Sequence, residues 1–492
     1  MGKKNNNKSK SKDNNSTQNQ INMLNAQIGK YASVKESTTL ATEMYKLRSI
    51  SRDKLRKALS NPYQISNTDI LQDASMILKA TSGTYRRVLN LISNMNTFDH
   101  ILYPKDISRL KTKEKITKAY MNSASQLEKY NIKFTSAWIT EKVLELGEVY
   151  LYKIEDNSGM VLQQIPAKFC MITMIENNVM RYAINIKKLT DKNIISFPEE
   201  IKNIYKKYKS NLLTREELID NTYFQLSDKA VAFNYDLDSV KGVPFFCFIF
   251  DDLMELEDMK DLKSTNAVIE SIKLIHQKIP FGKNDEPLVD LNLIPIYHNS
   301  TKANLPKGTA ITTNPLELET HTLSDGKSKI NDYVKEAKEF IFDNAGINTA
   351  LLNSDKINNE SILNGIIADS LIPMRIQQMI ENWVNFELNK DKKANLFNMK
   401  FIGTTHFNKM NLSKQYREDM GYGGSKSLFI ASTGFTPLQA INTLQAEKLM
   451  GFDEFLIPQQ TSHTQSSGRP DKSDIGTDNG NSTQAKGNGE ND

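Results

Sequence analysis

Two helical segments on either side of a proline-rich insert constrain the fold of this chain more than any other feature of its sequence. Apolar residues recur at helical spacing from Leu253 to Ile279, which predicts one helix over residues 251–279 that Pro280 ends. A second helix is predicted over residues 327–344, where Gly346 is placed to cap its end. The apolar face of this second helix combines Ile330, Val334, Ala337 and Ile341.

The insert between the two helices covers residues 281–323. It is punctuated by Pro287, Pro295, Pro306 and Pro315. Two runs of alternating apolar and polar residues, 288–297 and 316–323, are typical of strands. We therefore expect strands and turns in the insert.

A long helix is predicted after a polar loop at residues 353–359. It extends from Glu360 to about Asn389 and carries Pro373 in its middle. Proline has no N–H to donate and its ring clashes with the preceding turn, so Pro373 must kink or break this helix. A strand at 397–402 follows, and then a helix after Asn411, a break at 421–424 and two short helices at 426–432 and 437–449.

The first half of the chain divides into a helical part and a strand-rich part. Helices are predicted over residues 33–60, as a pair broken at Ser82-Gly83 within 67–96, and over 112–130 and 136–146. From Gly147 onward, short β-rich runs separated by turn residues predict a small antiparallel sheet, with a helix at 198–209 and a strand pair at 223–225 and 230–233. The predicted fold class is α+β, mainly helical.

Composition narrows the functional classes. Residues 1–35 and 459–492 are dominated by small polar residues that cannot bury enough apolar area to fold, so we expect disordered tails, the first of them basic. With 63 basic and 58 acidic residues the net charge is +5, too balanced for a strong binder of duplex DNA. The basic tail could contact nucleic acid or an acidic partner, or it could simply be solvated.

The cysteines and the hydropathy argue against two classes of protein, secreted proteins held by disulfides and membrane proteins. Cys170 and Cys247 lie in apolar contexts and predict buried free thiols rather than a disulfide framework. The longest apolar run, 243–250, contains Pro244 and is too short to span a bilayer, and the start is too polar for a signal peptide. We expect neither membrane insertion nor secretion.

Motifs that would carry chemistry are incomplete. Gly326-Lys327-Ser328 ends like a phosphate loop, but His321 stands where its first glycine should be, and in the glycine-rich stretch 421–427 the lysine follows Ser425 instead of a glycine. Six acidic residues between Asp251 and Asp261 could suggest a two-metal nuclease. They follow one another around a single helix, however, which favours a structural role at the helix start.

The remaining catalytic signatures are missing as well. The six histidines show no zinc-ligand spacing, and no nucleophile elbow is present. The sequence therefore predicts no catalytic residues, no metal site and no cofactor, and the chain is not expected to be an enzyme.

The order helix, insert, helix, polar loop and kinked helix resembles the portal proteins of tailed bacteriophages, particularly those of Gram-positive hosts. Four passages are also similar to that family, and the resemblance covers about residues 40–460. These passages are residues 82–87 with 94–95 and 103–104, residues 164–170, residues 250–258, and residues 340–348 with 376–389.

The resemblance implies an architecture. The chain would form a wing of helices and a small antiparallel sheet (36–250), a first stem helix (251–280), a strand-containing clip (281–326) and a second stem helix (327–345). A channel loop (346–359), a kinked helix with a strand returning to the wing (360–410) and a helical crown (411–458) would follow.

It also implies a function. Portal subunits form a ring, usually a dodecamer, at one capsid vertex of the virion, through which double-stranded DNA enters during packaging and leaves during ejection. The expected partners are the terminase large subunit, head-completion or adaptor proteins, and the major capsid and scaffolding proteins, with assembly in the host cytoplasm and no membrane contact. The ATPase of the packaging motor would belong to terminase.

Two sets of residues are candidates for proximity to DNA. Asn353, Ser354, Asp355, Lys356 and Asn358 belong to the implied channel loop, and Lys356 is its only basic residue, although it could equally be an ordinary solvated lysine. Lys335 and Lys338 could face the lumen while the opposite apolar stripe packs between subunits, or they could form ion pairs on the helix surface, which we favour slightly.

Two alternative functions stay open at this point. One is a metal-dependent nucleic-acid enzyme of the packaging machinery that uses the acidic segment. The other is a different structural subunit of the capsid or tail.

Overall fold

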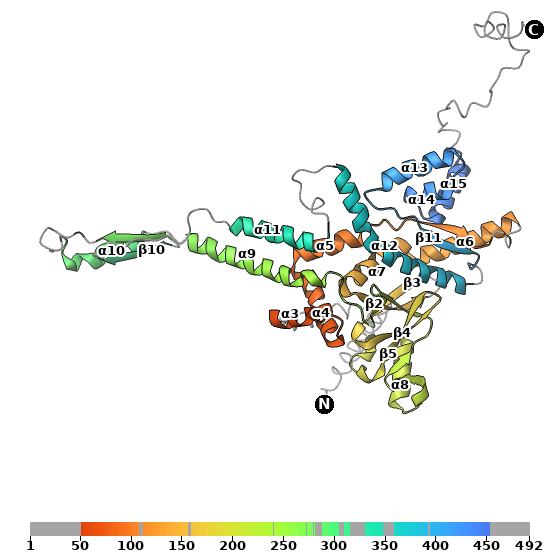
Figure 1. The fold of residues 1–492 in the computed structure, drawn as a ribbon, viewed down its shortest axis with the longest axis horizontal. Coiled ribbons are helices and arrows are strands. Elements are labelled where there is room, and N and C mark those ends of the chain that lie inside the picture. The colour runs from red at the N-terminus through yellow and green to blue at the C-terminus, as the bar shows by residue number, and fades with distance from the viewer. Residues whose placement is uncertain are drawn as a thin grey trace, which may run out of the picture. The chain divides into compact units, whose positions relative to one another are not determined.

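The computed structural model describes residues 51–452, apart from 107, 109–111, 156–158, 240, 272, 279, 281–287, 305–308, 315–329, 348–358 and 392–393 (Figure 1). Both predicted tails, the run 316–323 and residues 348–358 of the predicted channel loop therefore lie outside the described residues. Contacts divide the chain into two units, residues 1–438 and 439–492. Helices dominate the described part, and most of its strands are antiparallel, which confirms the predicted fold class.

The predicted helices of the first half are confirmed where the structure describes them, although residues 33–50 of the first one lie outside the described residues, and several helix ends lie at capping residues. Ser82 ends α4 and starts α5, where its side chain accepts a hydrogen bond from the Tyr85 amide. Thr112 caps α6 in the same way, and Gly147 ends α7 with a φ of +80°. The bounds are α3 Arg52–Leu59, α4 Ile65–Thr81, α5 Gly83–Ser93, α6 Lys113–Tyr130 and α7 Ile132–Leu146.

The strand-rich part forms a seven-stranded sheet with the order β3-β2-β8-β5-β7-β6, in which β4 also pairs with β5 and all ladders are antiparallel. The predicted strand pair is wrong in one respect, because β7 and β8 each pair with β5 and not with one another. The bounds are β2 Glu148–Glu155, β3 Met160–Ile165, β4 Cys170–Glu176, β5 Val179–Asn185, β6 Leu218–Ile219, β7 Tyr223–Gln225 and β8 Ala230–Asn234.

A close backbone approach joins the helical part to this sheet. Any side chain at Gly147 or Gly242 would overlap neighbouring backbone, so only glycine allows the two segments to meet. The adjacent Glu148 carboxylate is buried and accepts hydrogen bonds from the Gly242 amide at 3.0 Å and the Tyr150 hydroxyl at 2.8 Å. Burial raises the pKa of Glu148 although these hydrogen bonds oppose the shift.

Helix α8 (Glu199–Lys209) begins after Pro198 and covers a second, smaller core. Its Ile201 and Ile204 are buried with the ring of Tyr205 against the sheet. The lysines of α8 lie on its outer side, and a short 3-10 turn, η4 (Ile194–Ser196), precedes it. Cys170 is buried in this core and Cys247 is partly exposed, and both thiols are free.

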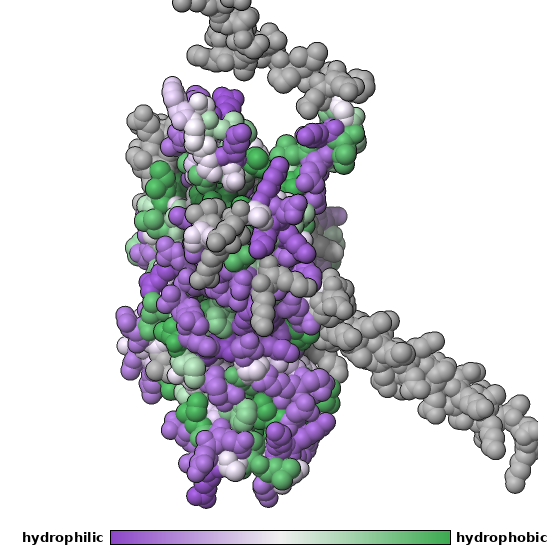
Figure 2. Space-filling model, turned by 90° about the vertical axis from the view of Figure 1, so that its right-hand side faces the viewer, coloured by the Kyte–Doolittle hydropathy of each residue, from purple (hydrophilic) through white to green (hydrophobic). Residues whose placement is uncertain are grey.

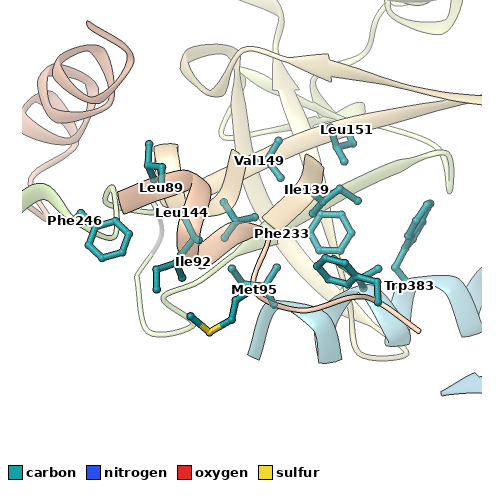
Figure 3. Close-up of a cluster of buried hydrophobic side chains, with 14 of the residues drawn as sticks. Leu89, Ile92, Met95, Ile139, Leu144, Val149, Leu151, Phe233, Phe246 and Trp383 are labelled. Carbon is teal, nitrogen blue, oxygen red and sulfur yellow. The ribbon is translucent and has the colours of Figure 1, made fainter. Parts of the chain in front are cut away.

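The main core lies between the first helices, the sheet and the long helix α12 (Asn359–Lys390) (Figure 3). Trp383 of α12 stacks on Tyr130 with ring centroids 6.0 Å apart and meets Phe233 edge-on at 6.1 Å. Lys153 of β2 forms an ion pair with the buried Glu387 of α12. The second half of α12 is thus fixed to both the helices and the sheet.

The predicted return strand is confirmed as β11 (Phe397–Phe401), which pairs antiparallel with β1 (His100–Pro104). Asn385 of α12 also binds the Met399 backbone, donating to its carbonyl at 3.0 Å and accepting from its amide at 2.7 Å. The chain after α12 is therefore tied back to β1, in the first half of the chain.

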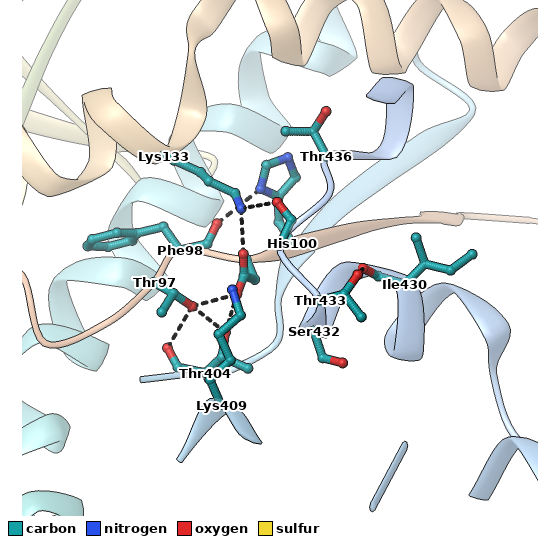
Figure 4. Close-up of polar contacts among 12 residues, drawn as sticks. Thr97, Phe98, His100, Lys133, Thr404, Lys409, Ile430, Ser432, Thr433 and Thr436 are labelled. Carbon is teal, nitrogen blue, oxygen red and sulfur yellow. Dashed lines mark hydrogen bonds and ion pairs between the residues drawn. The ribbon is translucent and has the colours of Figure 1, made fainter. Parts of the chain in front are cut away.

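A buried carboxylate holds the segment that follows β11 (Figure 4). Asp99, at the start of β1, has no exposed side-chain surface and lies 2.5 Å from Lys133 of α7 and 3.1 Å from Lys409 of α13. The hydroxyl of Thr404 donates to Asp99 at 3.1 Å, and Lys133 also donates to the Gly434 carbonyl at 2.6 Å. The helices involved are α13 (Lys409–Gly421) and α14 (Lys426–Ser432), and α15 (Pro437–Met450) follows.

Two predictions for the central segment are wrong. The helix expected over 251–279 ends earlier, as α9 (Phe250–Ser271), and residues 273–278 form strand β9 (Lys273–Lys278), which pairs in parallel with β10 (Thr309–Asn314). The run 288–297, expected as a strand, forms the turn η7 (Leu291–Leu293) and helix α10 (Ile294–Ala303). Pro295 lies in the first turn of α10, where a missing N–H costs nothing.

Candidate functional site

Helices α9 and α11 (Ile330–Asn344) form an antiparallel hairpin (Figure 1). The side-chain amide of Asn344, the last residue of α11, donates to the carboxylate of Asp252, in the first turn of α9, at 2.9 Å. The base of the hairpin is therefore closed by a direct hydrogen bond. The insert, with β9, α10 and β10, connects the other ends of the two helices.

The apolar stripe of α11 packs within its own chain. Ile341 has no exposed surface, and Val334 and Ala337 pack against the same core, to which α9 contributes the buried Leu253 and Leu256. Val334 and Ala337 are only partly buried in the single chain, so packing of this stripe between subunits stays a prediction.

Helix α11 ends as predicted. Gly346 has a φ of +67°, and the amide of Ile347 donates to the Phe342 carbonyl at 3.2 Å, which caps the last turn. The chain then enters residues 348–358. Asn353, Ser354, Asp355, Lys356 and Asn358, the predicted channel-loop residues, lie in this range, outside the described residues.

Lys335 and Lys338 both lie on the exposed side of α11. The ammonium group of Lys335 is 4.0 Å from the carboxylate of Glu339, one turn away, which fits the interpretation as a surface ion pair. Lys338 makes no ion pair with any residue that the structure describes. Both lysines are thus solvent-facing in the single chain, and their position relative to a lumen stays a prediction.

The acidic segment of α9 is paired with helix α3. Arg52 contacts Asp251 at 2.9 Å, Asp258 at 2.9 Å and Glu255 at 3.5 Å, and Arg56 contacts Asp251 at 2.9 Å. Partial burial would raise the pKa of Asp251, but the hydrogen bonds and charges of the two arginines outweigh it and hold this pKa below its usual value. These acids therefore act as an ion-pair surface that fastens α3 to the hairpin.

Sequence reasoning missed these two arginines. Arg52 and Arg56 are spaced one helical turn apart, and Asp251, Glu255 and Asp258 follow a similar spacing on α9. Basic and acidic residues at matching helical spacing were the signal that could have indicated this pairing. Nothing in the sequence places the two helices together, because Arg52 and Asp251 are 199 residues apart. Within the described part of the chain, no three His, Cys, Asp or Glu side chains are grouped closely enough to hold a metal ion.

Pro373 lies inside α12, and its side chain is buried. The helix is continuous from Asn359 to Lys390, so of the two predicted outcomes the break does not occur, and the ribbon bends along its course (Figure 1). Pro373 removes one helical hydrogen bond, to the carbonyl of Asp369. The anchored half of α12 around Trp383 lies beyond this point.

Strands β9 and β10 lie side by side. In their parallel ladder Lys273 is paired with Thr309 and Lys278 with Asn314, so both strands run in the same direction. Ile296 and Tyr297 of α10 are more than half exposed. Among the described residues, no helix is both long and apolar enough to cross a membrane.

Comparisons with known proteins add little. No family model and no curated protein matches the sequence. Among solved structures, the chain is similar to one from the neck of an empty gene transfer agent particle computed with C6 symmetry, with a TM-score of 0.40 and 10% identity over 71% of this chain and 90% of that chain. Another comes from the virion of a native gene transfer agent particle, with a TM-score of 0.37 and 10% identity over 83% and 97%. Both TM-scores are low.

Proposed function

We propose that this chain is the portal subunit of a tailed-phage-type head, which forms a ring at one capsid vertex. The ring is the channel for genome packaging and ejection, and it docks terminase and head-to-tail connector proteins. The observation that carries the proposal is the hairpin of α9 and α11, with an insert at one end and the bent helix α12 directly after it. This order matches the stem, clip and kinked helix that the sequence resemblance implies.

The hairpin suits the wall of a channel. Its helices bury Leu253, Leu256 and Ile341 in their own chain, and the exposed side carries charged side chains of both signs together with Leu262 and Phe340. A channel that moves DNA must not hold it, because each retained phosphate contact adds to affinity. Lysines interspersed with acids, as in the pair of Lys335 with Glu339, support transient contact with DNA and not a clamp.

The insert suits a docking module. It is connected at the end of the hairpin opposite the bond between Asn344 and Asp252, and its strands β9 and β10 pair with one another in parallel. Exposed apolar residues on α10, such as Ile296, are available to a partner. In this proposal the insert meets terminase during packaging and adaptor proteins afterwards.

In this proposal, ATP hydrolysis belongs to terminase and not to this chain. The sequence lacks a complete phosphate loop, and the acids of α9 are engaged by Arg52 and Arg56. These contacts count against the alternative of a metal-dependent nucleic-acid enzyme. Metal-dependent DNA cleavage by the purified chain that is lost in an Asp251→Ala variant would support the enzyme instead.

The position of the chain in particles tests the proposal. A copy tagged at the C-terminus and labelled with gold is expected at a single vertex of each head, where the tail joins. Labels distributed over the shell or along the tail would instead indicate another capsid or tail subunit.

A further inference from the structure

A cavity of about 580 Å³ lies between α8 and the turn η4, far in the sequence from the hairpin. We name it the α8 groove. One wall consists of Lys202, Lys206 and Lys209, which follow the i, i+4, i+7 spacing and so share one face of α8. The opposite wall consists of Ile194 and Ile195.

The lysines of the groove are only partly neutralised. Lys202 pairs with Glu199 at 2.8 Å, and Lys209 pairs with Asp191 at 2.6 Å, across the groove. Lys206 is exposed and forms no ion pair with any described residue. Three ammonium groups and the single carboxylate of Asp191 line the cavity, so the groove carries an excess of positive charge.

The apolar lining is accessible. Ile195 is 62% exposed although it lines a concave surface, and the largely buried ring of Tyr205 also contributes to the lining. In Figure 2, the lower end of the molecule, where α8 lies, shows mostly hydrophilic surface with small hydrophobic patches among it. Cations and apolar surface therefore meet in one concavity.

We infer that the α8 groove binds an acidic polypeptide segment of a partner protein, with a bulky apolar side chain against Ile194 and Ile195 and a carboxylate on Lys206. The volume is in the range of sites that enclose small ligands or a few side chains, ~300–1,000 Å³. Charge complementarity selects an acidic segment, and the isoleucines select one with an apolar anchor.

Nucleic acid fits the groove less well. A phosphate backbone is bound by several unpaired cations along its path, but two of the three groove lysines already have carboxylate partners. The inference goes beyond the proposed portal function and holds for the single chain whether or not rings form.

Fluorescence anisotropy with the purified full-length chain tests the inference. The probe is a fluorescein-labelled peptide in which glutamate and leucine alternate. Glutamine in place of glutamate, or serine in place of leucine, is expected to abolish most of the binding, because each removes one of the two contacts. Probe peptides that bind equally well without leucine would overturn the inference.

Two charge reversals on the same helix give a matched comparison. Lys206→Glu is expected to weaken peptide binding roughly tenfold, because an attraction becomes a repulsion. Lys207→Glu changes the same charge on the next residue, which is exposed and does not line the groove, and is expected to leave binding nearly unchanged. Equal losses in both variants would show unspecific attraction and overturn the inference. Ile195→Ser should weaken binding without any change in charge.

Labelled duplex and single-stranded DNA serve as competing probes. If DNA binds more tightly than the peptide and loses affinity in Lys206→Glu, the groove is a phosphate site and the inference is wrong. Circular dichroism of each variant checks folding, and Lys206→Gln replaces the reversal if that variant does not fold.

Discussion

The ammonium group of Lys133 lies 2.5 Å from a carboxylate oxygen of Asp99, which is completely buried (Figure 4). Lys409 approaches the other oxygen at 3.1 Å, so one acid holds two lysines from helices that are far apart in the sequence. In the proposed portal this contact joins the wing, which supplies Asp99 and Lys133, to the first residue of α13, the helix that leads into the crown.

Asp99→Asn is expected to loosen the segment from Thr404 to Gly434. The substitution keeps the size of the side chain but leaves two lysines without their counter-charge. We expect the free energy of unfolding to fall by about 2 kcal/mol, a moderate loss because both lysines remain partly hydrated. Hydrogen exchange measured by mass spectrometry should speed up in residues 404–434. Asp238→Asn, at an exposed position, is the control, and unchanged exchange in Asp99→Asn would contradict the role of this contact.

The neighbouring His100 makes stability depend on pH. Its ring is buried, Nδ1 donates to the Phe98 carbonyl at 3.1 Å, and burial lowers the pKa of His100 from 6.5 to about 4. In the unfolded chain His100 binds a proton below about pH 6.5, whereas the folded chain does so only near pH 4. Its contribution to stability is therefore complete above pH 6.5 and is lost as the pH falls, by about 3 kcal/mol at pH 4.

Urea unfolding between pH 7 and 4 measures this loss. His100→Phe, which cannot titrate, is expected to flatten the pH profile in this window, and His406→Gln, at an exposed histidine, is expected to leave it as in the native chain. Identical slopes for the native chain and His100→Phe would contradict the assignment.

Removal of Arg52 is expected to release helix α3 from the hairpin. Arg52 contacts three carboxylates of α9, but these are partly exposed, so Arg52→Ala should cost only about 1 kcal/mol, less in high salt. Faster hydrogen exchange in residues 52–59 measures the effect. Lys57→Ala lies on the same helix, at an exposed position without such contacts, and an equal effect there would rule out the proposed ion-pair surface.

A change in the predicted channel loop tests the implied DNA-proximal residues. Deletion of residues 354–358 is expected to leave oligomers intact and to reduce the fraction of DNA-filled heads, because it removes Lys356 and shortens the predicted polar loop. A glycine-serine replacement of equal length separates the loss of side chains from the loss of length. Normal filling of heads by the deletion variant would remove the proposed role.

Elements whose ends depend on local chemistry could be predicted from the sequence. Ser82, Thr112 and Gly147 mark helix ends because capping involves residues only three or four positions apart. The length of α12 followed from its periodicity, and its return strand from the β-type run at 397–401.

Elements that depend on distant partners could not be predicted. Ile272, Ile275 and Ile279 fit a helical stripe, but the residues around them form β9 because Thr309–Asn314 supplies a ladder. The same reason applies to the contacts of the buried Asp99. Thr404 and Asp99 are 305 residues apart, so only the folded chain shows that they share a hydrogen bond.

Electron microscopy of the purified full-length chain tests the portal proposal most directly. It predicts closed rings of uniform subunit number, twelve in most portal proteins that the sequence resembles, with an open hole in end views. Monomers, flat sheets or small oligomers without a central channel would contradict the proposal.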